Sequence, residues 1–182
     1  RQLGRILIAA DAAHSFGAKY KGKRAGSYAD ITCFSFHAVK NLTTAEGGAV
    51  CFNLPDDFDH DEIYKEFCIK ILHGQSKDAL AKMQKGAWKY DVLEAGYKCN
   101  MTDIQAAIGL IELERYQENM DRRATIFGLY YNGFKDCSWA MLPIEKDEDR
   151  STCYHLFQLC IDTITEEQRD AIIHEIFKKD EL

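Results

Sequence analysis

The side chains best suited to covalent chemistry lie in three short motifs within the first fifty residues. The motifs read D-A-A-H from Asp11 to His14, S-F-H-A-V-K from Ser35 to Lys40, and E-G-G from Glu46 to Gly48. A lysine amine can hold an aldehyde as an imine, an acidic group can keep a ring nitrogen protonated, and a hydroxyl can donate to a phosphate. The motifs therefore offer an anchor, a charge and a phosphate donor close together in the chain.

The segments that precede these motifs have the pattern of buried strands in an α/β sheet. Residues 6–10 form a continuous apolar run that ends at Asp11, and residues 31–36 and 47–52 are two further strand candidates. In α/β folds, ligands bind in the crevice outside the carboxyl ends of the strands. We therefore expect the Asp11 carboxylate to project into such a crevice, with Lys40 in the turn beyond the second strand.

Turn and helix signals organise the middle of the chain. The Gly- and Lys-rich residues 17–26 have turn chemistry, and residues 57–72 approximate one apolar face of a helix. The run T-D-I-Q is a capping box, with Thr102 as N-cap and Gln105 as its partner. It opens a long helix that continues or restarts over residues 122–134.

A change of pattern after this helix predicts a domain boundary. Residues 137–149 contain a proline and a charge-rich turn. Residues 156–161 then have the pattern of a strand, and T-E-E-Q over residues 165–168 is a second capping box that opens a helix. We assign residues 1–135 to one domain and residues 136–182 to the start of another.

Further motifs extend the pattern along the chain. They are H-G at residues 73–74, G-Y-K-C-N-M-T-D-I-Q-A-A-I-G-L at residues 96–110, and Y-H-L at residues 154–156. With the first three motifs, they resemble the DegT (DegT/StrS) family of sugar aminotransferases that depend on pyridoxal 5'-phosphate (PLP). The resemblance implies an α/β protein of PLP-dependent transferase fold type I, like aspartate aminotransferase. This chain would hold the C-terminal part of the large domain, with its linking helix, and the start of the small domain.

The resemblance also implies a role for five side chains. Lys40 would form the Schiff base with PLP and then move a proton between substrate and cofactor, while Asp11 would hold the pyridine nitrogen protonated. Ser35 would bind the phosphate, and His14 would pack near the ring oxygen. Asn100 would contact phosphate or substrate, in a segment that reaches the neighbouring subunit's site in family dimers.

Each of these residues also has a purely structural interpretation. Lys40 could be a surface lysine, Asp11 a helix N-cap, and Ser35 a buried serine bonded to backbone. The motifs around these three favour the cofactor roles. For His14, a core histidine is an equal alternative. For Asn100, the alternative is a loop asparagine, and many relatives carry arginine at this position.

The activity implied is transamination, with glutamate as amino donor and a nucleotide-linked ketosugar as acceptor, in aminodeoxysugar and polysaccharide biosynthesis. Two alternatives stay open: a PLP-dependent sugar dehydratase, and a non-catalytic regulatory or scaffold protein on the same fold. Dehydratase relatives replace the Schiff-base lysine with histidine, so Lys40 favours transamination. A homodimer with shared active sites is expected from the family and from the apolar residues 97–110.

Composition limits the other classes of function. The net charge is −6 with both signs mixed along the chain, which argues against a nucleic-acid groove or an anionic membrane surface. The histidines lack metal-ligand spacing, so no metal is expected, and the sequence contains no G-x-S-x-G elbow. A small-molecule substrate fits this composition better.

Cysteine usage and the chain ends bear on location and completeness. The seven cysteines include no C-x-x-C pair, and we expect reduced core residues in a cytoplasmic protein. No run is long enough to span a bilayer, and no secretory segment is present. The chain lacks an initial methionine and ends in K-D-E-L, which we interpret as truncation of an internal fragment. Such a fragment alone is expected to hold PLP poorly.

Overall fold

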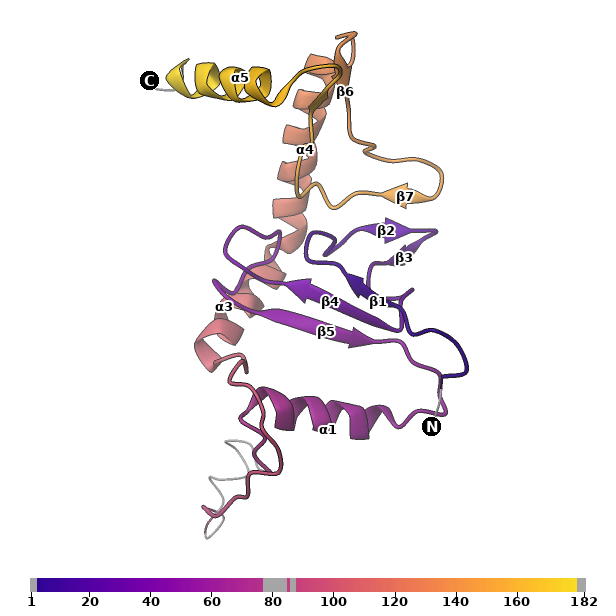
Figure 1. Ribbon diagram of the computed structural model, residues 1–182, viewed down its shortest axis with the longest axis vertical. Helices are drawn as coiled ribbons and strands as arrows, with labels where there is room; N and C mark the ends of the chain where they lie inside the picture. Colours follow the sequence, from indigo (N-terminus) through magenta and orange to yellow (C-terminus); the bar gives the residue numbers. More distant parts are fainter. Residues whose placement is uncertain (1–2, 77–84, 86–87, 180–182) are drawn as a thin grey trace.

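The computed structural model describes residues 3–76, 85 and 88–179 (Figure 1). A three-stranded sheet lies at its centre, formed by β1 (Ala9–Asp11), β4 (Ile31–Ser35) and β5 (Gly48–Phe52). The helices are α1 (His60–Ile71), α3 (Asp103–Glu114), α4 (Tyr116–Phe134) and α5 (Glu166–Lys179). Of the final K-D-E-L run, residues 180–182 lie outside the described residues.

The central sheet combines a parallel and an antiparallel pair. β1 and β4 are parallel, with Asp11 opposite Cys33, whereas β4 and β5 are antiparallel, with Ser35 opposite Gly48. The first strand was predicted over residues 6–10, but it begins only at Ala9. Ahead of the strand, the backbone N–H of Ile8 donates to the Asp30 carboxylate at 2.8 Å rather than to a neighbouring strand.

A second small sheet joins segments that are far apart in the sequence. The strands β2 (Lys19–Tyr20) and β3 (Lys23–Arg24) form a hairpin, and β7 (Arg150–Ser151) pairs antiparallel with β2. Lys21 and Gly22 have φ of 45° and 78°, which is the geometry of a type I′ turn. The predicted turn is therefore confirmed, and it positions the hairpin to hold the passage that follows α4.

Side-chain caps mark the starts of α1 and α3. Asp59 accepts from the N–H of Glu62 at 3.0 Å to open α1, and Thr102 forms the complete predicted capping box with Gln105 to open α3. The helix predicted to continue or restart over residues 122–134 is confirmed, and it restarts as α4 at Tyr116. The tyrosine hydroxyl donates to the carbonyl of Phe16 at 2.8 Å, a distant contact that helical periodicity does not reveal.

The C-terminal region contains a two-stranded ladder and one helix. β6 (Ala140–Met141) pairs antiparallel with β8 (Cys160–Ile161), so the strand predicted over residues 156–161 forms only at its end. The Thr165 capping box is confirmed by its two hydrogen bonds with Gln168. α4 ends one residue before the boundary predicted between residues 135 and 136, and that boundary stays a prediction.

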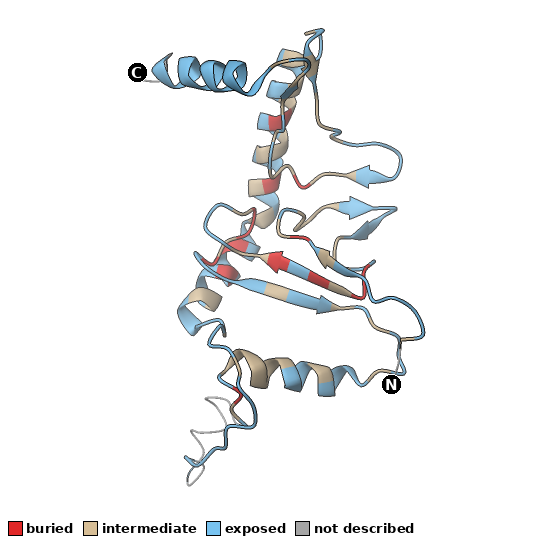
Figure 2. Cartoon of the chain, viewed as in Figure 1, coloured by how far each residue is buried: buried red, intermediate tan, exposed pale blue. Residues whose placement is uncertain are grey.

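The core is small and lies where β4, the loop after it and α4 meet (Figure 2). Its buried apolar residues are Ala12, Ala29, Phe34, Leu42, Met120, Phe127 and Cys153. The prediction of core cysteines is wrong for most of the set, since only Cys153 is buried and Cys33, Cys51, Cys99 and Cys160 are exposed. All seven are free thiols. No helix among the described residues is both long and apolar enough to cross a bilayer.

Gly48 is expected to be intolerant of any side chain. A Cβ built there would lie 2.6 Å from the backbone carbonyl oxygen of Phe34, so Gly48→Ala must displace β5 from β4. We expect Gly48→Ala to lower the free energy of unfolding of the whole protein by about 1–3 kcal/mol. The control is Gly128→Ala within α4, where a Cβ meets nothing within 4 Å and helix propensity favours alanine by about 1 kcal/mol. Equal stabilities of the two variants in chemical denaturation would contradict this.

Asp30 should make stability depend on pH in the acid range. Its hydrogen bond to the Arg5 guanidinium, at 2.7 Å, and the N–H of Ile8 lower its pKa from 3.8 to about 2. A lowered carboxyl pKa contributes stability above pH 4 that is lost as the pH falls through about 2. Denaturation midpoints should therefore fall less steeply over this window in Asp30→Asn than in the unmodified protein. Parallel pH profiles would refute the assignment.

Candidate functional site

Two of the predicted residues lie at the carboxyl ends of neighbouring strands. Asp11 ends β1, and Ser35 ends β4 two residues beyond Cys33, the partner of Asp11. The N–H of Ala12 donates to the Cys33 carbonyl at 2.9 Å, which continues the pairing past the strand end. Because the strands are parallel, the carboxylate and the hydroxyl share one edge of the sheet, as the sequence predicts.

Local hydrogen bonds orient both side chains. An oxygen of the exposed Asp11 carboxylate accepts from the N–H of Ala13 at 3.0 Å. The half-buried Ser35 hydroxyl accepts from the N–H of His37 at 3.3 Å. These bonds are the turn-forming interactions typical of aspartate and serine, and they leave the second carboxylate oxygen and the hydroxyl proton available for a ligand.

Lys40 lies in a loop that leaves β4 and returns as β5. We call residues 36–47 the lysine loop. Its ends are joined by the bond from the N–H of Phe36 to the carbonyl of Gly47 at 2.8 Å, and Lys40 closes a turn on the carbonyl of His37 at 2.9 Å. Thr44, only 1% exposed, donates its N–H back to Phe36 at 2.9 Å. The half-buried Lys40 is therefore carried by a loop fixed at several points.

Helix α3 supports the far side of the lysine loop. The Gln105 side-chain amide donates to the carbonyl of Glu46 at 2.8 Å, while its oxygen completes the Thr102 capping box. Gly109 is buried, and a Cβ there would lie 2.9 Å from the Thr44 methyl group. A glycine at this position thus allows the helix to approach the loop closely.

A hydrogen-bonded cluster fixes the other side of the loop. Asn41, 7% exposed, donates its side-chain amide to the Cys153 carbonyl at 2.5 Å, and its oxygen lies 3.0 Å from Nδ1 of His155. The Cys153 thiol donates to the carbonyl of His14 at 3.0 Å, and the rings of His14 and His155 are 4.6 Å apart. The cluster therefore connects the residue after Lys40 with His14.

Burial is the main cause of the electrostatic shifts in this cluster. It lowers the pKa of His155, and the charges of His14, Lys40 and Arg123 act in the same direction. It also raises the pKa of the Cys153 thiol. Both groups are accordingly neutral near pH 7.

An aromatic cluster fixes the turn that carries His14. Phe16 makes edge-to-face contacts with Phe34, Phe36 and Tyr116 at centroid distances of 5.4–5.6 Å. The Tyr116 hydroxyl donates to the Phe16 carbonyl, and burial raises its pKa to about 12. The segment after β1 is thereby packed against the start of α4.

The Asn100 side chain makes its hydrogen bonds within its own segment. It is half-buried just before α3, where its side-chain oxygen accepts from Lys98 and its amide donates to the Met101 carbonyl at 3.3 Å. Within the part of the chain that the structure describes, no hydrogen bond connects it with Lys40 or Asp11. The sequence motifs led to no role for Asn41 and His155, although Asn41 directly follows the S-F-H-A-V-K motif and His155 lies in Y-H-L.

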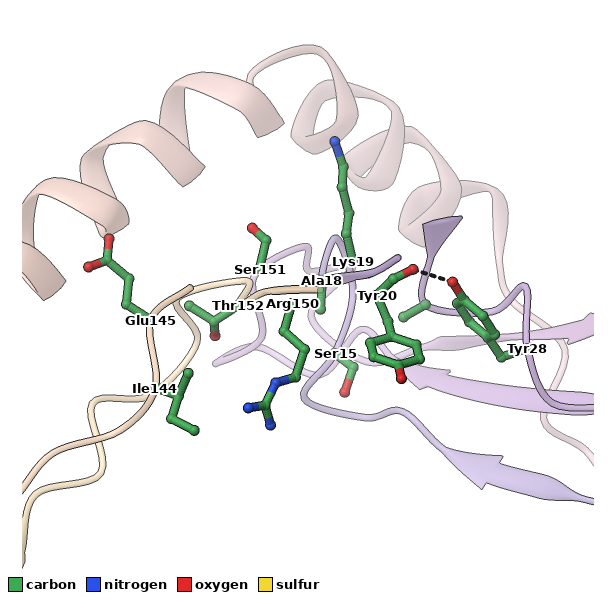
Figure 3. Close-up of a pocket in the computed structure, with 11 residues that line it drawn as sticks. Ser15, Ala18, Lys19, Tyr20, Tyr28, Ile144, Glu145, Arg150, Ser151 and Thr152 are labelled. Atoms are coloured by element: carbon green, nitrogen blue, oxygen red, sulfur yellow. Dashed lines mark hydrogen bonds between the residues drawn. The ribbon is translucent and has the colours of Figure 1, made fainter. Parts of the chain in front are cut away.

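A cavity of about 410 Å³ lies elsewhere, between the β2–β3 hairpin and residues 144–152 (Figure 3). It is lined by Ser15, Ala18, Lys19, Tyr20, Ala25, Tyr28, Ile144, Glu145, Arg150, Ser151 and Thr152. The Tyr28 hydroxyl donates to the Tyr20 carbonyl, and Asp147 holds the Arg150 guanidinium at 2.7 Å. None of the predicted site residues lines this cavity.

The chain is similar to proteins of known sequence and structure. Residues 3–181 match the model of the DegT/DnrJ/EryC1/StrS aminotransferase family. The chain is 37% identical over 158 residues to the spore coat polysaccharide biosynthesis protein SpsC of Bacillus subtilis. It is 33% identical over 156 residues to the UDP-4-amino-4,6-dideoxy-N-acetyl-beta-L-altrosamine transaminase of Campylobacter jejuni. These matches cover 86% of this chain and 39% and 38% of the two relatives.

A solved structure is similar to this chain in both fold and sequence. Spr1654 of Streptococcus pneumoniae, in its PMP form, superimposes with a TM-score of 0.88 and 47% identity, over 96% of this chain and 44% of that one. The chain thus spans about two-fifths of the length of these relatives. Because the family model matches almost the entire chain, and the fold agrees as well, the chain belongs to the DegT/DnrJ/EryC1/StrS aminotransferase family.

Proposed function

We propose that the whole protein is a PLP-dependent aminotransferase that transfers an amino group from glutamate to a nucleotide-linked ketosugar. The observation that carries this proposal is the placement of Asp11, Ser35 and the lysine loop at the carboxyl edge of β1 and β4. Asp11 and Ser35 lie at one edge of the sheet and Lys40 lies in the loop that leaves it, in a chain whose family is that of aminotransferases.

The donor set fits PLP. The cofactor, when bound, supplies an electron sink that stabilises negative charge at the carbon undergoing amino transfer. Asp11 would hold the proton on the pyridine nitrogen, since an adjacent carboxylate favours the charged form of that nitrogen. Ser35 would donate its hydroxyl proton to the phosphate. Forms of Spr1654 described as PLP, PMP and apo support this choice of cofactor.

Lys40 would serve both as covalent anchor and as proton carrier. Its loop is closed at both ends by β4 and β5 and supported by α3, so the amine starts from a defined backbone position. A lysine with a fixed backbone position suits both anchoring and proton transfer, because proton transfer depends on short distances between donor and acceptor.

Two further residues have proposed roles. His14 is proposed to contact the ring oxygen of PLP, and Asn100 to contact phosphate or substrate across a dimer interface.

The names of relatives support the sugar as the substrate class. The Campylobacter protein is named as a transaminase for a UDP-linked amino sugar, and SpsC is named for spore coat polysaccharide biosynthesis. We infer a nucleotide-linked ketosugar as the acceptor and a surface polysaccharide or glycoconjugate as the destination of the product. A cytoplasmic location is part of this proposal, and the absence of disulfides among the seven cysteines supports it.

The two rival functions make different demands on the site. A sugar dehydratase on this fold would carry histidine in place of the Schiff-base lysine, whereas this chain has Lys40. A regulatory or scaffold protein would require neither the carboxylate at Asp11 nor the amine. The presence of Asp11 at the end of β1 and of Lys40 in the loop that leaves β4 favours amino transfer.

Lys40→Ala should abolish cofactor anchoring. The whole protein, mixed with PLP and reduced with borohydride, is expected to carry a covalent adduct on Lys40, seen by peptide mass mapping. Lys40→Ala should show no adduct at this peptide and should lose amino transfer. The control is Lys23→Ala, which removes an exposed hairpin lysine and should retain both properties. Turnover that survives in Lys40→Ala would overturn the proposed function.

A homodimer is proposed because the segment before and within α3 presents apolar side chains to solvent. Tyr97, Ile104 and Leu110 are 73%, 76% and 64% exposed, and Met101 and Ile108 are also exposed. Large exposed apolar surfaces mark sites of contact between proteins. A second copy placed there would also bring the Asn100 segment toward the partner's site, as the proposed shared sites require.

Ile104→Asp should convert the dimer to monomer. An aspartate in the first turn of α3 is compatible with the helix, so the substitution affects the exposed apolar face rather than the fold. Sedimentation at micromolar concentration is expected to show a dimer for the unmodified protein and a monomer for the variant. Ser138→Asp adds the same charge at an exposed turn and should remain dimeric. A monomeric unmodified protein would exclude this interface.

A further inference from the structure

The orientation of the Asn41 side chain determines the protonation of His155. The carbonyl of Cys153 can only accept, so the side-chain nitrogen of Asn41 must face it, at 2.5 Å. The amide oxygen of Asn41 then faces Nδ1 of His155 at 3.0 Å. Because that oxygen can only accept, Nδ1 must carry the proton.

The surroundings of His155 favour the neutral ring. The side chain is half-buried, and the charges that act on it, those of His14, Lys40 and Arg123, are all positive or potentially positive. Each disfavours an imidazolium at this position. His155 is therefore the neutral tautomer with its proton on Nδ1, in which Nε2 is a hydrogen-bond acceptor.

The same short segment contacts both predicted cofactor-site elements. Asn41, the residue directly after Lys40, is bonded to Cys153 and His155, which follow it by 112 and 114 residues. On the other side, the Cys153 thiol donates to the His14 carbonyl at 3.0 Å, and the His155 ring lies 4.6 Å from the His14 ring at 56°. The lysine loop and the turn that carries His14 are therefore joined through residues 153–155.

The two residues that form this connection, Asn41 and Cys153, are both buried. Asn41 is 7% exposed and Cys153 is 3% exposed, and the Asn41 amide also lies 3.6 Å from the sulfur of Met120 on α4. A buried amide left without its partners is destabilising, so the loop is held in the one arrangement that satisfies both ends of the side chain.

We propose that Asn41 and His155 are positioning residues that hold Lys40 and His14 in register for amino transfer, through the hydrogen bond donated by His155 Nδ1. This inference rests on the proposed function. Neither residue touches the reacting atoms: Asn41 acts through the backbone of the lysine loop, and His155 acts through Asn41 and through its contact with the His14 ring.

Two substitutions at His155 separate the hydrogen bond from the bulk of the ring. In His155→Asn the side-chain amide nitrogen occupies the place of Nδ1 and can still donate to Asn41. In His155→Gln the amide extends toward the place of Nε2, and the bond to Asn41 is lost. Both substitutions remove the imidazole, so they form a matched pair.

The first measurement needs no cofactor. Long-range ¹H–¹⁵N NMR of the whole protein without PLP, labelled at histidine, should show His155 as the neutral Nδ1–H tautomer at pH 7. A ring with its proton on Nε2, or a charged ring, would overturn the proposal, because neither agrees with the Asn41 geometry.

The second measurement is a kinetic comparison of the two variants with the unmodified protein. We expect His155→Gln to lower kcat on the order of 100-fold, with KM for the sugar little changed, as a misplaced reacting group does. His155→Asn should recover most of kcat. Unchanged kcat in His155→Gln, or equal losses in both variants, would refute the positioning role.

The borohydride-trapped adduct on Lys40 distinguishes failure of the proposed function from failure of the positioning role. If the unmodified protein forms no borohydride-trapped adduct on Lys40, amino transfer by this site is wrong and the positioning role fails with it. If the adduct forms in the unmodified protein but His155→Gln behaves like it, the function stands and only the positioning role is lost.

Discussion

The parallel pairing of β1 with β4 is the constraint on which the rest of the site depends. It sets Asp11 opposite Cys33, so that the next residues of both strands leave the sheet at the same edge. Parallel strands cannot be joined by a tight turn, and here the chain between them forms the β2–β3 hairpin. β5 then returns antiparallel to β4, which makes the lysine loop an excursion between two paired strands.

Packing from later parts of the chain turns this edge into a defined site. α3 approaches the lysine loop at Gly109, α4 contributes Tyr116 and Met120, and residues 153–155 connect Asn41 with His14. Each support uses a different interaction: close approach at a glycine, an aromatic cluster, and a hydrogen-bonded amide. The site is consequently specified by contacts between distant segments rather than by the strand ends alone.

The local features of the fold could be predicted from the sequence, because local chemistry determines them. The capping boxes at Thr102 and Thr165 and the turn around Gly22 need only neighbouring residues, and all three are found. The start of β1 was misplaced, because Asp30 acts on it from a distance. The cysteines were misassigned because an apolar run predicts burial only when another layer covers it.

The sequence separations around Asn41 have a consequence for the order of folding. Its partners lie 112 and 114 residues downstream, so they leave the ribosome roughly 5–20 s after Asn41 does, at ordinary rates of synthesis. During that interval the loop can pair its strands but cannot bury its amide. Such non-local contacts also slow folding, because chain closure costs entropy before the contact forms. The site is thus completed late in synthesis. In a nascent chain stalled before residue 153, the lysine loop would lack the hydrogen bonds of Asn41 to Cys153 and His155.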